Sequence, residues 1–127
     1  IDKTLPVITL NGSNPMNLTV GQTFTDPGAT AYDQEDGDKT SSIIATGSVN
    51  TGVAGTYTRY YNVEDSEGLS APQKTRIVNV TAAPIPPTVS LSADPTTINK
   101  GSSSTLTWSA TNATSCTKSG GTFTGTI

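Results

Sequence analysis

The stretch Gly55-Thr56-Tyr57-Thr58-Arg59-Tyr60-Tyr61-Asn62-Val63 is the longest strand candidate in the sequence. It is rich in threonine and tyrosine, which favour strands, and it contains no proline. Because successive side chains of a strand point to opposite faces, Tyr57, Tyr61 and Val63 share one face and Tyr60 lies on the other. We expect the first three to point inward and Tyr60 to point toward solvent.

Shorter strand candidates surround this stretch and are separated by turn residues. Asn11-Gly12 and Asp26-Pro27-Gly28 are strong turn signals. The further candidates are Val7–Leu10, Met16–Val20, Ile43–Val49 and Arg76–Val80. In the last of them we expect Val78 and Val80 to point inward. Six or so short strands separated by turns predict an all-β fold, an antiparallel β-sandwich with almost no helix.

The composition of the 127 residues (13.0 kDa) agrees with this fold class and excludes several functions. Small hydroxyl residues are abundant (24 Thr and 14 Ser), whereas charged residues make up only 13%. The absence of histidine excludes a Ser-His-Asp triad, and a single cysteine excludes a zinc-cysteine cluster and an intrachain disulfide. A net charge of −3 argues against nucleic-acid binding, and no apolar run is long enough for membrane insertion. We therefore expect a protein that is not an enzyme.

A proline-rich segment divides the chain. Three prolines between residues 84 and 87 favour an extended spacer. The sequence therefore predicts a complete sandwich over residues 1–82, a linker over 83–87 and the N-terminal part of a second domain over 88–127. Strand candidates in this last part are Thr88–Ala93, Ser104–Ala110 and Thr114–Thr117. About forty residues are too few to close a sandwich, so we expect an incomplete sheet with exposed edges, in a chain that is a piece of a longer protein.

Five motifs of the first domain occur together, in order and at matching spacings, in a known family. They are Asp2–Gly12, Val20–Ala31, Asp36–Asp38, Gly55–Thr58 and Asp65–Gly68. They resemble the bacterial immunoglobulin-like repeat of large surface-anchored or secreted proteins, which also occurs in some pesticidal crystal proteins and is similar in style to HYR and cadherin-like repeats. The resemblance implies an immunoglobulin-like sandwich with a mostly structural role. Gly55-Thr56-Tyr57 at the start of the long strand also resembles the tyrosine corner of Greek-key sandwiches, in which the tyrosine hydroxyl bonds back to the backbone.

The second segment is similar to a different bacterial immunoglobulin-like module, on residues Pro87–Leu91 and Ser104–Cys116. This resemblance implies that Trp108 lies in the core beside Cys116, and that Cys116 forms a disulfide with a cysteine beyond Ile127. Such a bond requires an oxidising compartment, which fits an extracellular protein at the cell surface. The alternative is a free, buried cysteine that packs as a small apolar residue.

Seven of the ten acidic residues fall in two short loops, residues 33–38 and 64–67. Calcium takes about six to eight oxygen ligands, and loops that meet at one end of a sandwich supply carboxylates and carbonyls. The candidate calcium ligands are Asp33, Asp36, Asp38 and Asp65, with Asp2 as a further candidate. Their spacing does not match an EF-hand. The alternative is that these residues form ordinary turns, with Asp38 as a cap.

These observations predict a non-catalytic extracellular spacer module of a larger bacterial surface, adhesin-like or filament protein. Its partners are then the neighbouring immunoglobulin-like modules of the same protein. One alternative is an accessory module that binds a surface glycan or a host protein through Tyr32, Tyr60 and Arg59. A second alternative is an assembly subunit whose incomplete sheet accepts a strand from another copy of the chain.

Overall fold

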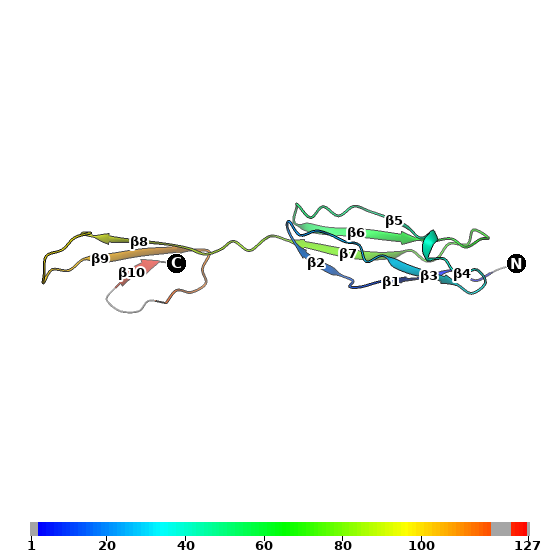
Figure 1. Ribbon diagram of the computed structural model, residues 1–127, viewed down its shortest axis with the longest axis horizontal. Coiled ribbons are helices and arrows are strands. Elements are labelled where there is room, and N and C mark those ends of the chain that lie inside the picture. The colour runs from blue at the N-terminus through cyan, green and yellow to red at the C-terminus, as the bar shows by residue number, and fades with distance from the viewer. Residues whose placement is uncertain (1–2, 118–122, 127) are drawn as a thin grey trace. The chain divides into compact units, whose positions relative to one another are not determined.

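The computed structural model describes residues 3–117 and 123–126 and shows an all-β chain. The chain forms two compact units, Ile1–Ala83 and Pro84–Ile127 (Figure 1). Residues 82–87 are exposed and belong to no strand. The change from one unit to the other therefore falls in the proline-rich segment.

The first unit is a sandwich of two sheets, which confirms the predicted fold class. Sheet 1 has the strand order β1-β3-β4 and sheet 2 the order β2-β7-β6-β5. A single 3-10 turn, η1 (Thr40–Ser42), lies between β4 of sheet 1 and β5 of sheet 2. The strands are β1 (Val7–Leu10), β2 (Met16–Thr19), β3 (Ala29–Asp33), β4 (Gly37–Asp38), β5 (Ile44–Thr46), β6 (Gly55–Asn62) and β7 (Lys74–Thr81).

The chain changes sheet between β1 and β2. β1 pairs antiparallel with β3 in sheet 1, whereas β2 pairs parallel with β7, with Met16 opposite Val78 and Thr19 opposite Thr81. This parallel pair departs from the purely antiparallel sandwich that the sequence predicts. Its cause is the change of sheet, because the chain crosses between the layers over residues 11–15 and enters sheet 2 beside the last strand of the unit.

The core between the sheets contains mostly small apolar residues. Tyr61 and Val63 are buried as the alternation predicted, whereas Tyr60 is 38% exposed. Val78 and Val80 of β7 are also buried. The main apolar cluster consists of Ile8, Ala29, Ala31, Tyr61, Val63 and Ala71. Because half of these residues are alanines, larger polar side chains fill part of the interior, and Arg76 is the largest fully buried one.

The sequence pattern missed one strand and overestimated the length of another. β3 lies where the sequence shows only a turn followed by Ala29 and Ala31, because alternating alanines give a weak strand signal. Of the candidate strand Ile43–Val49, only β5 (Ile44–Thr46) is extended and paired, and η1 ends at Ser42, shortly before β5 begins. Directly after β5, Gly47 has a φ of +86°, a backbone conformation that side chains disfavour.

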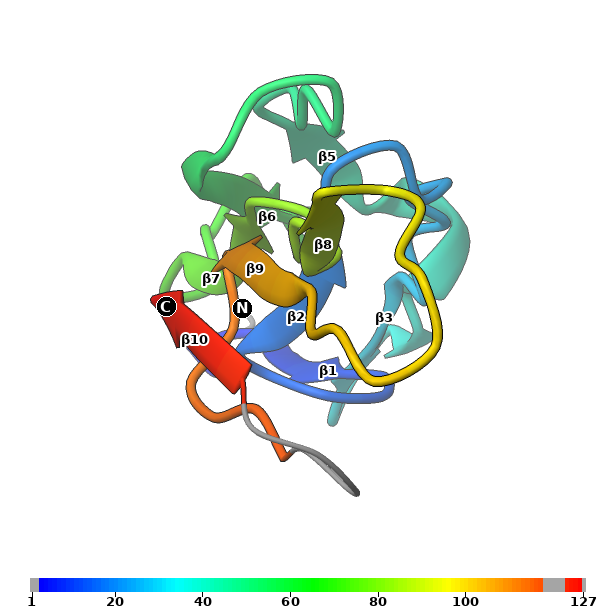
Figure 2. The ribbon, with the colours of Figure 1, turned by 90° about the vertical axis from the view of Figure 1, so that its left-hand side faces the viewer.

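The second unit is a single sheet with the strand order β10-β9-β8 (Figure 2). Its strands are β8 (Thr88–Asp94), β9 (Thr105–Thr111) and β10 (Phe123–Thr126), and β10 runs parallel to β9. The predicted strand at Thr114–Thr117 is therefore wrong. Asn112 follows β9 with a φ of 57°, a left-handed conformation that ends an extended strand.

This second sheet has one hydroxyl face and one apolar face. The pairing of β8 with β9 sets Ser90 opposite Ser109 and Leu91 opposite Trp108. The two serine hydroxyls are 2.7 Å apart and hydrogen-bonded. On the apolar face Val89 and Leu91 are 66% and 64% exposed. Over residues 84–117, which the structure describes, only Ala110 is buried, so this face has no covering layer within that range.

Candidate functional site

The first acidic loop is organised around Asp33, at the end of β3. This side chain is fully buried, and its Oδ1 accepts hydrogen bonds from the backbone N–H groups of Glu35 and Asp36, both at 2.9 Å. The Thr4 hydroxyl donates to its Oδ2 at 3.4 Å. Asp33 therefore folds its own loop, because a buried carboxylate with several N–H donors holds a tight turn.

Asp36 joins the two acidic loops. Its carboxylate accepts hydrogen bonds from the Ser66 hydroxyl at 2.8 Å, the Ser66 amide at 2.6 Å and the Lys39 ammonium at 3.1 Å. The bond from the Ser66 hydroxyl, followed by those from Lys39 and the Ser66 amide, lowers the pKa of Asp36 below its ordinary value. The loops at residues 33–38 and 64–67 thus meet at one end of the sandwich, where the sequence analysis placed them together.

Asp38 and Asp65 also form turns. Asp38 Oδ1 accepts from the Thr40 amide at 2.9 Å, and the hydrogen bonds from the Thr40 side chain and amide lower the pKa of Asp38. Asp65 is 8% exposed, and its Oδ1 accepts from the amides of Glu67 and Leu69 at 2.9 and 2.7 Å. Its Oδ2 is buried without a hydrogen-bond partner among the described residues.

The four candidate calcium ligands lie in the same two loops but do not form one ligand set. Within residues 3–117 and 123–126, no three acidic or cysteine side chains come close enough together to hold a metal ion. Asp2 lies outside the described residues. Calcium binding here stays a prediction, and the geometry supports the alternative that these carboxylates cap the turns of their own loops.

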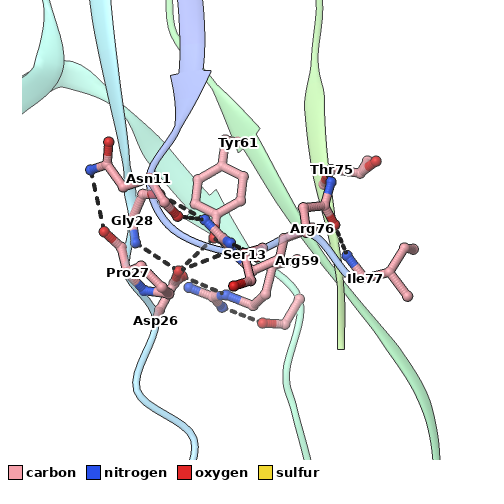
Figure 3. A network of polar contacts seen from close by, with 12 residues as sticks. Asn11, Ser13, Asp26, Pro27, Gly28, Arg59, Tyr61, Thr75, Arg76 and Ile77 are labelled. Carbon is pink, nitrogen blue, oxygen red and sulfur yellow. Dashed lines mark hydrogen bonds and ion pairs between the residues drawn. The ribbon is translucent and has the colours of Figure 1, made fainter. Parts of the chain in front are cut away.

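A second polar site lies between the sheets and centres on Arg76 (Figure 3). The guanidinium donates to the carbonyl oxygens of Asn11 and Ser13, and to that of Gly28 at 3.0 Å. Its Nε donates to the Tyr61 hydroxyl at 3.2 Å, and its carbon lies 5.9 Å from the centre of the Tyr61 ring. Arg76 therefore bonds the interior of the sandwich to carbonyl groups of the crossing between β1 and β2.

Asp26 completes this network at the turn before β3. Its Oδ1 accepts from the Tyr61 hydroxyl at 2.6 Å and from the Gly28 amide at 2.9 Å, and its Oδ2 accepts from Arg59 Nε at 3.0 Å. Arg76 Nε lies 3.7 Å from Oδ1. Burial raises the pKa of Asp26, but the hydrogen bonds from Tyr61, Gly28 and Arg59 outweigh it and leave the pKa below the ordinary value. The carboxylate is therefore ionised at neutral pH between two cationic side chains.

Sequence reasoning missed this network. Arginine is rarely buried, so the sequence gives it no place in a core by default. The signal that would have found it is the phase of the strand, because Arg76 lies two and four residues before Val78 and Val80 and so shares their inward face.

The other residues singled out by the sequence lie at separate places. The Tyr57 hydroxyl donates to the backbone carbonyl of Val53 at 2.9 Å. Tyr32 of sheet 1 is 62% exposed, whereas Tyr60 lies on sheet 2.

Two residues of the second unit were also singled out. Trp108 is half-buried, and its Nε1 has no hydrogen-bond partner among the described residues. Cys116 is free and exposed, which contradicts the alternative of a buried thiol, while its pairing with a cysteine beyond Ile127 stays a prediction.

The first unit matches the family model described as Bacterial surface protein, Ig-like domain, over residues 8–80. Because this match covers more than half of the 127 residues, the chain belongs to this family. The resemblance found in the sequence motifs is thereby confirmed for the first unit. No curated protein sequence matches the chain significantly.

Solved structures share the fold. A lipoprotein from Bacteroides thetaiotaomicron is 22% identical, with a TM-score of 0.54 over 80% of this chain and 55% of that chain. A structure of CBM51-2 in complex with GlcNAc and INT domains, from Clostridium perfringens ZmpB, is 22% identical, with a TM-score of 0.50 over 80% of this chain and 26% of that chain. The chain thus spans about half of the first protein and a quarter of the second. In the described part of the chain, no helix is long and apolar enough to cross a membrane.

Proposed function

We propose that this chain is a non-catalytic, extracellular spacer of a larger bacterial surface protein, and that its first unit carries mechanical load along that protein. The membership of the first unit in a family of bacterial surface domains supports the location. The hydrogen bonds of the buried Asp33 and Arg76 and of the half-buried Asp26 support a structural use of these charges, since each side chain is already bonded to groups of the fold.

The observation that carries the mechanical role is the parallel pairing of β2 with β7. Load that enters at the N-terminal end of the unit and leaves after β7 pulls these two strands in opposite directions along their axes. Since the strands are parallel, the hydrogen bonds between Met16–Thr19 and Val78–Thr81 share this load and break together. Peeling one strand from its end would instead break the same bonds one at a time.

Side chains reinforce this pair. Asn14 lies before β2, and its side chain donates to the Thr75 carbonyl at 3.1 Å and accepts from the Ile77 amide at 2.9 Å, so it extends the ladder along β7. Further along, Asn79 donates to Asn17 at 3.1 Å, and the Val20 amide donates to the Thr81 carbonyl at 2.8 Å. The segment that would have to slide under load is thus bonded to β7 from before β2 to just after it.

The second unit supports a place in an array of modules. A sheet with one apolar face needs a second layer to cover it, and the described residues of this unit provide none. We propose that residues 88–127 are one sheet of a second immunoglobulin-like sandwich, completed by further sequence of the same protein. The alternative is strand exchange with another copy, through the exposed edge of β8.

Single-molecule pulling of the full chain through its two ends tests the load-bearing role. We expect one cooperative rupture of the first unit, with a gain in length of roughly 270 Å less the folded span of the unit, because about eighty residues are released at ~3.4 Å each. Gradual extension without a discrete rupture would contradict the proposal. Asn14→Ala is expected to lower the rupture force, whereas the control Asn50→Ala, which removes only a local bond to the Gly52 amide, is expected to leave it unchanged.

Proteolysis of the full chain tests the division into modules. An unspecific protease is expected to cut first within residues 83–87 and to leave a resistant fragment that ends there, because this segment is exposed and belongs to no strand. Early cuts spread through residues 1–82 would contradict a folded first module.

A further inference from the structure

The outer face of sheet 1 carries a shallow hollow that the load-bearing role does not use. The register of the sheet sets Val7 and Asp38 on either side of Tyr32, and Thr9 opposite Thr30. These residues and Thr40 line a depression of about 350 Å³. This volume is near the lower end of the range for ligand pockets, roughly 300–1,000 Å³.

The hollow presents one exposed aromatic ring with polar groups around it. Tyr32 is 62% exposed, although it lies in the middle of β3, where a tyrosine would gain free energy by burial. Thr9 and Thr30 are exposed residues of the same hollow, and each carries a hydroxyl that can donate and accept hydrogen bonds. The Asp38 carboxylate has about four acceptor positions, of which the Thr40 amide and side chain take two.

This set of groups matches a saccharide better than a protein surface. The electron-rich face of a tyrosine ring attracts the polarised C–H groups on one face of a sugar ring, while sugar hydroxyls need acceptors and donors at its edge. A stable protein interface requires about 800 Å² on each partner with an apolar centre, whereas the exposed apolar groups of this hollow are only Val7 and Tyr32.

We propose that the Tyr32 face of sheet 1 is a binding site for neutral saccharides. Tyr32 stacks on the sugar ring, Asp38 accepts hydrogen bonds from its hydroxyls, and Thr9 and Thr30 contact its edge. The charge of the site also predicts a preference among sugars. The hydrogen bonds from Thr40 lower the pKa of Asp38, so its carboxylate is ionised at neutral pH and repels an acidic sugar. The net charge of −3 acts in the same direction.

The test is an NMR titration of the full chain with four neutral disaccharides (lactose, maltose, cellobiose and chitobiose) and with 3′-sialyllactose as the acidic counterpart of lactose. A small, open site predicts a dissociation constant on the order of 1 mM for at least one neutral sugar. The largest chemical-shift changes are expected at Thr9, Thr30, Tyr32 and Asp38. Tyr32→Ala is expected to weaken binding by about tenfold or more, and Tyr32→Phe is expected to retain it, because the ring provides the stacking surface.

The matched control is Tyr60→Ala, which removes an exposed tyrosine from sheet 2. It is expected to leave sugar binding unchanged, and Asp38→Asn is expected to reduce the discrimination against 3′-sialyllactose. The proposal is overturned if no sugar changes the chemical shifts of these residues at a sugar concentration of about ten times the expected dissociation constant. It is also overturned if Tyr32→Ala binds as well as the unchanged chain, or if Tyr60→Ala loses binding to the same degree. None of these outcomes alters the pulling or proteolysis results, so the two proposals fail independently.

Discussion

At the scale of single residues, Arg76 does two tasks in the first unit. Its aliphatic stem fills space in a core whose other residues are mostly alanine and valine, and its guanidinium binds backbone carbonyls of the segment that crosses between the sheets. Substitutions therefore act on packing and on hydrogen bonding together.

Arg76→Met tests this role, because methionine keeps much of the volume but no donor. The change removes the Arg76 donor from the carbonyls of Asn11 and Ser13, while the Gly28 carbonyl keeps the Asn11 amide as a donor. It also leaves the Asp26 carboxylate with one neighbouring cation fewer, so we expect a loss of about 3–5 kcal/mol in the free energy of unfolding. Lys74→Met on the same strand is the control and is expected to cost less than about 0.5 kcal/mol, because Lys74 is exposed. Urea unfolding measures both. Equal losses in the two variants would show that the guanidinium bonds add no stability.

The same network predicts how stability depends on pH. The pKa of Asp26 in the folded chain is below its unfolded value of 3.8, so its contribution is present above that pH and is lost as the pH falls toward the folded pKa. We expect the free energy of unfolding to fall in acid, and to fall less steeply in Asp26→Asn.

The network also predicts a loss of stability in alkali. Burial, followed by the hydrogen bond to Asp26, raises the pKa of Tyr61 above 10.0, so the free energy of unfolding also falls as the pH rises beyond 10. Tyr61→Phe is expected to remove this alkaline loss, and a profile unchanged by either variant would contradict the linkage.

The acidic loops yield a prediction about metal removal. Asp33, Asp36, Asp38 and Asp65 already accept hydrogen bonds from groups of the two loops, and they do not form one ligand set within the described residues. If these carboxylates only cap turns, which is the alternative that the geometry supports, the melting temperature is the same with calcium and with a chelator. A melting temperature that rises with calcium, and no longer does so in Asp65→Asn, would instead establish the calcium site.

At the scale of strands and turns, the backbone at Gly47, directly after β5, lies close to the backbone of β6. Gly47 and Gly21 both have positive φ, +86° and +89°, but only at Gly47 would an added Cβ overlap the backbone carbonyl of Thr58. Gly21→Ala is expected to cost about 1–2 kcal/mol from the backbone conformation alone. Gly47→Ala is expected to cost roughly 1–3 kcal/mol more, because the carbonyl belongs to β6 and has little room to move. Equal losses on thermal or urea unfolding would contradict this difference.

The strands that the sequence predicted well are those with a strong alternating pattern. Tyr61 of β6 and Val63, which follows the strand, are buried as the alternating pattern predicted. The contact of Asp36 with Ser66 bears out the expectation that the two acidic loops meet. The crossing from β1 to β2 was not predictable, since its partner β7 lies about sixty residues further along the chain. The sequence named Tyr32 as a candidate for glycan contact but grouped it with Tyr60 and Arg59. Its neighbours Val7 and Asp38 were not predictable, because they meet Tyr32 only through the register of sheet 1.

At the scale of the whole chain, the two units place their stabilising contacts differently. The first unit has a core enclosed between two sheets and hydrogen-bond partners for the buried Asp33 and Arg76, whereas the second is one sheet whose apolar face is exposed within the described residues. We therefore expect the first unit to resist load as a separate body, and the second to need another layer.

The direction of pulling tests this load-bearing role most directly. Force applied through the two ends of the chain shears β2 against β7, whereas force applied through Thr23→Cys and Ala82→Cys, on a Cys116→Ser background, separates the same strands from one end. We predict a rupture force several times higher for pulling through the ends, because the hydrogen bonds of the parallel pair then break together. Equal rupture forces in the two directions would contradict the claim that the β2–β7 pair makes the first unit a load-bearing module.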